Sequence, residues 1–394
     1  MNILIISSIY PEPESYQLPA NTKVVHYYAK KWQEEGHRVL VMHPYLNPLG
    51  AMKRRLRHPC YRIKDSLVEG VRVLFGEMQG WIPHRYDGMV CQQRLLARRM
   101  KGYLAEKIPD FRADRVIVDF PMTCLHFCRD FCKAEMAACT FHGVDVRMLE
   151  KMQGEKRKNA VHLLQHCFSR INFRSGPLLE RCRRLGAARE DSQVCYLGID
   201  EALVADEAAL EEKISRGTGK PVQIIFAGNL NRQKRVDHIL SALSRITVPL
   251  RLTIAGDGPE MEALREMAQR LPEDQEVVFA GRLPRQQVSA MMHQSDIFVM
   301  ISTNETFGLV YLEAMAQGCI AVGARGEGID GVIRDGENGF LVDPQDEEAL
   351  ANTLMKAAAL HAQDREAILR NGYATAKAMT DGRMAMDYLR KSGA

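Results

Sequence analysis

Short apolar segments recur along the whole chain, and stretches with the periodicity of amphipathic helices separate them. Continuous apolar runs of this length are typical of strands that are buried on both faces of a parallel sheet. The first half of the chain predicts strands at Ile3–Ile9, Arg38–His43, Val71–Phe75, Arg115–Asp119, Ala137–Phe141, Arg170–Phe173 and Gln193–Leu197. The second half predicts strands at Val222–Ala227, Leu250–Ala255, Glu276–Ala280, Ile297–Ile301, Ile320–Gly323 and Phe340–Val342.

The alternation pauses once, in a charged stretch that ends in Gly217-Thr218-Gly219-Lys220. We interpret residues 201–220 as a linker between two Rossmann-like, doubly wound α/β domains, residues 1–200 and 221–375. A chain of 394 residues is long enough for each domain to bury a core of its own. Two such domains imply a central cleft, and ligands of open α/β sheets bind beyond the carboxyl ends of the strands.

Composition argues against some classes of protein. The formal net charge of +4 is too small to indicate a nucleic-acid partner by itself. No run of about 18 apolar residues predicts a membrane-spanning helix. Residues 1–6 are typical of a buried strand and not of a signal peptide, because no basic segment or small-residue cleavage site accompanies them. We therefore expect a cytoplasmic protein.

Two glutamates eight positions apart, Glu305 and Glu313, mark the most informative stretch. A predicted strand ends near Ile301 and a helix begins near Phe307 or Gly308, so the first glutamate lies in a loop and the second in the helix. The unpaired amides and the dipole of such a helix start favour an anion such as a diphosphate. The two carboxylates could hold hydroxylated groups on either side of it. Taken alone, they fit a helix-capping acid and a solvated helix residue equally well.

Two other strand ends carry polar side chains. Asn229, Arg232 and Lys234 follow the first predicted strand of the second domain, and cations there could neutralise a leaving diphosphate. His142 follows a strand of the first domain and precedes Gly143, so its side chain is expected to face the cleft. The alternatives are a solvated basic turn and a structural histidine.

Together these motifs resemble the family-4 glycosyltransferases of the GT-B superfamily, which retain the anomeric configuration of the sugar. Glu305 and Glu313 match that family's E-x(7)-E signature. Further matches are Ala255–Glu260 to its AGxGP turn, Asp335–Val342 to its DGxNGxLV segment, and Tyr196–Asp200 to its NGxD element. The resemblance is strong over residues 193–346. In the first half it rests on the first strand, Gly36-His37-Arg38-Val39 and His142-Gly143.

The resemblance implies a role for each matching residue of the donor site. Glu305 would bind hydroxyls of the donor sugar, and Glu313 would bind the nucleotide ribose. The backbone amides of Phe307, Gly308 and Leu309 would hold the sugar and the diphosphate.

The resemblance also implies contacts from other segments. Lys234 would bind the diphosphate, and Arg282 and Leu283 would lie near the base. His142 would approach the donor sugar from the first, acceptor-side domain. Residues 376–394 would form a helix that packs back on that domain.

The chain departs from the family pattern at two places. Asn229 stands where the family often has an arginine, which Arg232 or Arg235 would have to replace. The family's first loop often carries a pair of glycines, whereas the loop Tyr10–Asn21 has none. Donor contacts from this loop therefore cannot be carried over, and it is a candidate for reading the acceptor.

The resemblance implies a hexosyltransferase that needs no metal and no cofactor, because helix amides and Lys234 would stabilise the leaving diphosphate. A UDP-sugar is favoured over a GDP-sugar as donor. Same-face attack is favoured, and a double displacement stays open. The acceptor would be a glycan or a lipid-linked sugar in surface polysaccharide synthesis. The alternatives are a GT-B nucleotide-sugar epimerase and a non-catalytic nucleotide-sugar-binding protein.

Two basic clusters of the first domain, Lys53–His58 and Arg94–Lys101, suggest peripheral contact with the inner face of the membrane. In the second cluster, Leu95, Leu96 and Met100 stand beside the charges, a mixture that is typical of an interfacial helix. The alternative is a solvated basic face.

Overall fold

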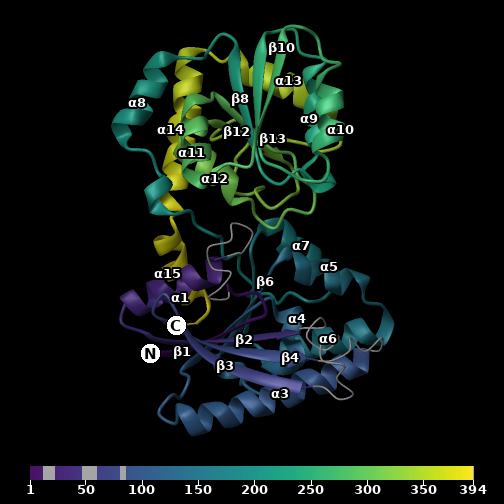
Figure 1. The fold of residues 1–394 in the computed structure, drawn as a ribbon, viewed down its shortest axis with the longest axis vertical. Coiled ribbons are helices and arrows are strands. Elements are labelled where there is room, and N and C mark those ends of the chain that lie inside the picture. The colour runs from purple at the N-terminus through teal and green to yellow at the C-terminus, as the bar shows by residue number, and fades with distance from the viewer. Residues whose placement is uncertain (12–22, 47–59, 80–85, 394) are drawn as a thin grey trace. The chain divides into compact units, whose positions relative to one another are not determined.

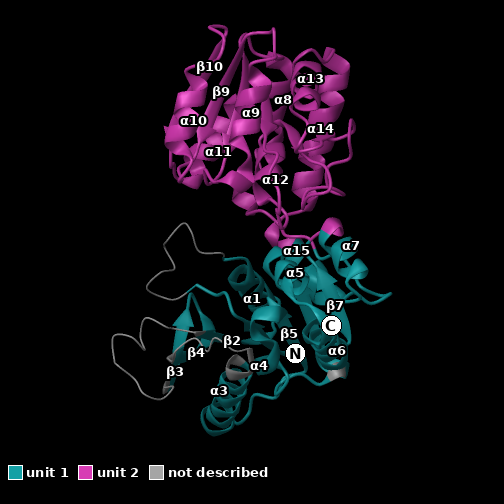
Figure 2. Cartoon of the chain, turned by 90° about the vertical axis from the view of Figure 1, so that its right-hand side faces the viewer, with its two compact units in different colours: residues 1–174, 178–195, 384–394 teal, residues 175–177, 196–383 magenta. Residues whose placement is uncertain are grey.

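The computed structural model describes residues 1–11, 23–46, 60–79 and 86–393. The chain divides into two compact units (Figure 2). Unit 1 comprises Met1–Arg174, Leu178–Cys195 and Met384–Ala394, and unit 2 comprises Ser175–Pro177 and Tyr196–Arg383. Within the described ranges, no helix is both long and apolar enough to span a bilayer.

Unit 1 contains a twisted sheet with the strand order β3-β4-β2-β1-β5-β6-β7 (Figure 1). The strands are β1 (Asn2–Ser7), β2 (Arg38–Leu46), β3 (Cys60–Val68), β4 (Val71–Gln79), β5 (Arg115–Asp119), β6 (Ala137–Phe141) and β7 (Arg170–Phe173). The β3–β4 pair is antiparallel and the other pairs are parallel. The chain leaves β1 toward β2 on one side and later returns to β5 on the other side. The crevice beyond β1 and β5 is therefore the topological switch point of this sheet.

Helices cover the sheet of unit 1. They are α1 (Val24–Glu34), α3 (Tyr86–Lys107), α4 (Pro121–Cys128), α5 (Gly143–Lys151), α6 (Gly154–Cys167), α7 (Gly176–Arg184) and, at the end of the chain, α15 (Asp381–Lys391), with a short 3-10 turn η1 (Ala134–Met136). Tyr388 of α15 is buried against Tyr28 and Trp32 of α1, at ring-centroid distances of 5.4 and 5.9 Å. Trp32 Nε1 donates a hydrogen bond to the carbonyl of Ala385. The end of the chain thus completes the core of unit 1.

Unit 2 contains a parallel sheet with the order β10-β9-β8-β11-β12-β13. The strands are β8 (Val222–Ala227), β9 (Leu250–Ala255), β10 (Gln275–Gly281), β11 (Ile297–Val299), β12 (Ile320–Ala324) and β13 (Phe340–Val342). The helical segments are η2 (Glu201–Leu203), α8 (Glu207–Arg216), η3 (Arg232–Lys234), α9 (Val236–Leu243), α10 (Met261–Ala268), α11 (Arg285–Gln294), α12 (Leu309–Ala316), α13 (Glu347–Ala358) and α14 (Ala362–Ala378). The switch point lies between β8 and β11. The expected pair of Rossmann-like α/β domains is confirmed.

Three segments differ from the expectations. Residues 201–220, interpreted as a linker, carry η2 and α8 and belong to unit 2, because Leu210 and Lys213 are buried there. The strand expected at Gln193–Leu197 is reduced to one isolated bridge, between Phe173 and Val194. β3 was not expected, because its charged residues obscure the alternation of an edge strand.

Candidate functional site

The loop between β11 and α12 ends in a backbone conformation that favours glycine, at Gly308. Gly308 precedes the first residue of α12 with a φ of +90°, in the left-handed region. A Cβ at this position would lie 2.7 Å from the ring of Tyr311. Asn304 also has a positive φ, of +58°. The loop therefore turns sharply and leads directly into the helix start that the sequence predicted.

Lys234 and Glu305 meet at the switch point of unit 2. Lys234 lies in η3, which follows β8, and Glu305 lies in the loop that follows the neighbouring strand β11. Lys234 Nζ is 2.6 Å from Glu305 Oε2, and both side chains are about one-fifth exposed, at 21% and 19%. The amide of Thr303 donates to the carbonyl of Gln233, at 2.8 Å, and joins the two loops. The structure thus pairs two residues that came from separate motifs.

A third loop, after β12, supports the loop that carries Glu305. The amide of Glu305 donates to Glu327 Oε2 at 2.9 Å. A Cβ on Gly328 would lie 2.4 Å from the backbone nitrogen of Phe307, so the two loops touch backbone to backbone. Sequence reasoning missed both Glu327 and Gly328. The signal that could have found them is a glycine shortly after the end of a buried strand.

Glu313 lies inside α12 and is paired with a neighbouring helix. Arg285 Nη2, from the first turn of α11, lies 2.6 Å from Glu313 Oε1. The side chain of Glu313 is 15% exposed and that of Arg285 is 42% exposed. Glu313 is therefore a mostly buried carboxylate with a cation beside it, and sequence reasoning missed Arg285.

The remaining predicted residues of unit 2 lie on loops of the same sheet edge. Arg232 is exposed and lies 3.6 Å from Glu260, so it does not join the pair formed by Lys234 and Glu305. Asn229 lies beside Gly258, whose Cβ would come within 2.5 Å of the Asn229 Oδ1 atom. Arg282 and Leu283, which follow β10, are exposed and half-buried respectively.

In unit 1, His142 belongs to a buried polar cluster. Asp119, His142 and Arg174 lie at or just after the carboxyl ends of the neighbouring strands β5, β6 and β7. Asp119 Oδ1 is 2.7 Å from His142 Nε2 and 2.6 Å from Arg174 Nη2. The hydroxyl of Tyr388 donates to Asp119 Oδ2 at 3.0 Å, and the ring of Phe120 stacks on the imidazole at a centroid distance of 3.8 Å. We call Asp119, His142, Arg174 and Tyr388 the buried polar cluster.

The charges of this cluster follow from its burial and pairing. Burial alone would raise the pKa of the Asp119 carboxyl, but Arg174 and the hydrogen bond with His142 lower it to about 2. Burial lowers the pKa of His142, which favours the neutral imidazole. An ionised Asp119 can only accept, so the 2.7 Å contact places the His142 proton on Nε2, and the longer 3.3 Å approach of Arg174 Nε to the same nitrogen is then not a hydrogen bond. Asp119 thus sets the tautomer of His142, and sequence reasoning missed Asp119, Arg174 and Tyr388.

The prediction that residues 94–101 form an interfacial helix is wrong in one respect, because two of the three apolar residues of this part of α3 are buried. Leu96 and Met100 are fully buried in the core of unit 1, where Gly76 of β4 leaves room for their side chains. Leu95 is the exposed apolar residue, at 46%, and Arg98 and Lys101 are exposed beside it. The apolar face of this helix therefore serves the core. The other basic cluster, residues 53–58, lies outside the described residues.

Comparison with protein families supports the prediction of a glycosyltransferase. Residues 209–375 match the family model described as "Glycosyl transferases group 1". The chain is 29% identical over 228 residues to N-acetyl-alpha-D-glucosaminyl L-malate synthase of Bacillus anthracis, which is 56% of this chain and 59% of that protein. It is 32% identical over 178 residues to the lipopolysaccharide core biosynthesis glycosyltransferase LpsE of Rhizobium meliloti, which is 45% of this chain and 50% of the relative. The matches thus span about half the length of these relatives.

Solved structures resemble the chain over nearly its whole length. HepE of Anabaena in complex with UDP has a TM-score of 0.69 at 18% identity and is covered to 99%, as is this chain. The apo form of the lipopolysaccharide outer core galactosyltransferase WaaB has a TM-score of 0.70 at 15% identity, with 99% of each chain covered. At such identities the likeness concerns the fold. The chain therefore has the GT-B fold of two Rossmann-like domains, and the match to the glycosyl transferases group 1 model, residues 209–375, falls in the second of them.

Proposed function

We propose that this protein is a retaining, family-4 hexosyltransferase that moves a sugar from a nucleotide-sugar to a glycan or lipid-linked acceptor. The observation that carries the proposal is the pair of Lys234 and Glu305 at the switch point of unit 2, directly before a helix that contains Glu313. All three residues lie within the segment that matches the glycosyl transferases group 1 model.

The geometry supports separate roles for the residues along this edge of the sheet, each binding a different part of the donor. The start of α12 offers unpaired amides and a positive dipole end to a diphosphate. Lys234 is placed to share its charge between Glu305 and the diphosphate, while the Glu305 carboxylate accepts hydrogen bonds from sugar hydroxyls. Glu313 lies about one turn into the helix and would accept from the ribose hydroxyls. His142 would approach the donor sugar from unit 1.

The proposed chemistry is cleavage of the bond between the sugar and the diphosphate, with the acceptor oxygen attacking from the same face. The leaving phosphate oxygen takes the acceptor proton. Lys234 and the amides at Phe307, Gly308 and Leu309 stabilise the charge that develops on the diphosphate, so no metal is invoked. This is the reason to expect metal-independent activity.

The comparisons support a choice of donor and of pathway. HepE, a structural neighbour, was crystallised with UDP and with UDP-glucose, which supports a UDP-sugar as the donor. LpsE and WaaB are named for lipopolysaccharide core synthesis, which supports an acceptor in surface polysaccharide synthesis. The proposed location is the cytoplasm, with electrostatic contact to the inner face of the membrane through basic residues of unit 1.

A thermal-shift panel of UDP-, GDP- and ADP-sugars tests the proposal. A ligand that binds the native state raises the melting temperature by mass action. We expect the largest shift with a UDP-sugar and a smaller shift in the variant Lys234→Ala. Product analysis then separates transfer from epimerisation or from binding without turnover. The proposal falls if no nucleotide-sugar shifts the transition.

Product analysis in the presence of EDTA tests metal independence. Because a lysine and helix amides would stabilise the leaving diphosphate, activity should survive EDTA. Complete loss on chelation, restored by magnesium or manganese, would show that the diphosphate is held differently.

A further inference from the structure

Two histidines lie one turn apart near the end of α6 in unit 1 (Figure 1). His162 and His166 are both exposed, whereas Ala160, Leu164 and Cys167 form the buried face of the same helix. Positions i and i+4 of a helix share one face, with their Cβ atoms about 5–6 Å apart. The two imidazoles therefore stand side by side on the solvent side of α6.

The two rings contact each other and are otherwise unengaged. Their centroids are 5.9 Å apart and their planes differ by 20°, so the rings are nearly parallel. Neither ring makes a hydrogen bond or an ion pair with any residue in the described ranges. A neutral imidazole carries one nitrogen with a free lone pair. Both rings can thus offer a nitrogen to a ligand that arrives from solvent.

Other histidines of the chain are held by a partner. His43 Nδ1 lies 2.8 Å from the carbonyl of Ser7, and His238 Nδ1 lies 3.2 Å from Glu347 Oε1. Such contacts fix the orientation of the ring and explain why a histidine stands there. In the part of the chain that the structure describes, no contact of this kind holds the pair on α6, so packing does not account for it.

Paired imidazoles at this spacing can chelate a divalent transition metal ion. Two histidines at i and i+4 on one helix face bind zinc in the H-E-x-x-H helices of metalloproteases. Imidazole nitrogens suit copper, zinc and nickel, and they approach zinc to about 2.0–2.1 Å. Rings that are already parallel and adjacent need only side-chain rotation to direct one nitrogen each at a common ion.

The position of the pair on the helix also favours a cation. His162 and His166 lie in the last two turns of α6, which ends at Cys167. The C-terminal end of a helix carries a negative partial charge, which attracts cations. Lys158 stands one turn before His162 on the same face, and its ammonium is paired with Glu155 at 2.9 Å. The charge that would repel a metal ion most directly is therefore compensated.

We propose that His162 and His166 form a surface site that binds one divalent copper or zinc ion as a two-point chelate. Among the described residues, no third histidine, cysteine, aspartate or glutamate completes the site, so water fills the remaining positions. The bound ion joins the last two turns of α6 and stabilises the end of this helix. The proposal is independent of the proposed transfer, which invokes no metal.

Titration of the full-length chain with Cu²⁺, followed by NMR of the imidazole C–H resonances, tests the site directly. Cu²⁺ is paramagnetic, so broadening should begin at His162 and His166. Zn²⁺ should bind at the same place more weakly, and Mg²⁺, which prefers oxygen ligands, should not bind there. His162→Ala and His166→Ala should each weaken Cu²⁺ binding by at least about tenfold, because the second contact of a chelate is intramolecular.

Thermal unfolding with Zn²⁺ provides a second measurement. An ion that binds the native state raises the melting temperature by mass action. The rise should occur in the wild type and should be much smaller in His162→Ala, whose melting temperature without metal gives the baseline. If transfer is observed, His162→Ala should keep it, since the ion has no part in the proposed reaction. Loss of nucleotide-sugar binding would remove the proposed function and leave this site untouched.

Two further variants make the test specific for the spacing. His361→Ala is the matched control, because His361 is exposed in unit 2 and has no histidine one turn away. It should leave Cu²⁺ binding unchanged. The double variant His166→Ala with Lys158→His moves the pair one turn toward the start of α6 and should restore binding. The proposal is overturned if Cu²⁺ broadens other histidines first, if either single alanine variant binds like the wild type, or if the moved pair binds no better than His166→Ala alone.

Discussion

Single residues at the ends of parallel strands carry the chemistry of both units. In unit 2, the ammonium of Lys234 neutralises the Glu305 carboxylate, and Arg285 neutralises Glu313. In unit 1, Arg174 and Asp119 are both buried, and each would be costly without the other. Each of these charged residues is paired with an opposite charge. A substitution of one residue therefore also leaves its partner unpaired.

The two glutamates of unit 2 should differ in their effects on turnover. Glu305→Gln should lower kcat by about a hundredfold or more, because this side chain contacts the reacting sugar in the proposed mechanism. Glu313→Gln should mainly raise the KM for the donor, because a ribose contact acts equally on ground and transition states. Steady-state kinetics measure both, with the exposed Glu266→Gln as control. Full activity of Glu305→Gln would contradict the assignment.

Asp119 should make stability depend on pH in a defined window. Its folded pKa of about 2 is below the unfolded value of 3.8, so its stabilisation is present above pH 4 and is lost as the pH falls toward 2. The shift corresponds to about 2 kcal/mol. The difference in unfolding free energy between Asp119→Asn and the wild type, measured with urea, should therefore shrink between pH 5 and pH 2.5. The exposed Asp274→Asn is the control, and a constant difference would count against the buried pair.

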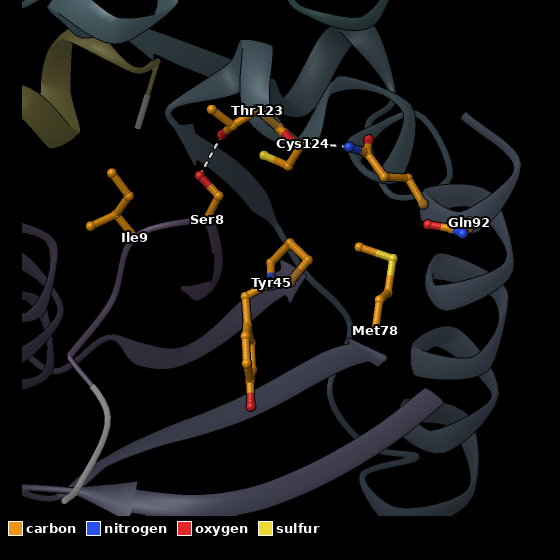
Figure 3. A pocket seen from close by; sticks show the side chains of 9 residues that line it. Ser8, Ile9, Tyr45, Met78, Gln92, Thr123 and Cys124 are labelled. Carbon is orange, nitrogen blue, oxygen red and sulfur yellow. Dashed lines mark hydrogen bonds between the residues drawn. The ribbon is translucent and has the colours of Figure 1, made fainter. Parts of the chain in front are cut away.

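At the scale of elements, the hairpin of β3 and β4 and the helix α3 extend the Rossmann-like pattern of unit 1. A tight turn joins the two strands through Glu69 and Gly70, which both have positive φ, at 43° and 86°. Helix α3 packs its apolar residues on β4, and its Gln92 lines a pocket of unit 1 together with Ser8 and Thr123 (Figure 3). Its exposed side remains basic, so a membrane contact of this element would be electrostatic.

Vesicle co-sedimentation should show salt-dependent binding to anionic lipid. Each exposed arginine or lysine contributes about 1 kcal/mol near an anionic surface. The double variant Arg98→Gln with Lys101→Gln should therefore bind anionic vesicles markedly less than the wild type, and Arg270→Gln in unit 2 should not. Added salt should release the protein. Equal, negligible binding to anionic and neutral vesicles at low salt would exclude this contact.

At the scale of the whole molecule, the two ends of the chain share one core. α15 lies against α1, and Tyr388 joins the buried polar cluster, where Thr140 donates to its hydroxyl. Arg174 lies over the Tyr388 ring, 4.4 Å from its centroid. Unit 1 is therefore completed by a helix that lies far along the chain from its other elements.

Substitutions at Tyr388 should measure how much the packing of α15 contributes to the stability of unit 1. Tyr388→Phe removes only the hydroxyl and should cost about 1–3 kcal/mol, because Asp119 loses a buried donor. Tyr388→Ala also removes the ring and should cost about 3–5 kcal/mol. Chemical unfolding followed by tryptophan fluorescence reports on Trp32, which contacts the same ring. Two variants as stable as the wild type would show that the last helix is dispensable for unit 1.

The local pattern of the sequence was sufficient to predict the two Rossmann-like units and most of their strands. Periodicity is a local property, and the ends of buried strands are marked by polar residues and glycines. For the same reason Lys234, Glu305 and His142 could be selected as candidates, although their roles in binding and catalysis stay predictions.

The tertiary structure alone decided the partners of these residues. Glu327 reaches Glu305, Arg285 reaches Glu313, and Tyr388 reaches Asp119 across long separations in the chain. The order of strands determines which loops become neighbours, and burial then selects which charges must pair. The same order placed Ser8 beside Thr123, because β1 and β5 are adjacent only in the folded sheet. Strand order depends on the packing of the whole sheet, so no single segment of the sequence encodes it.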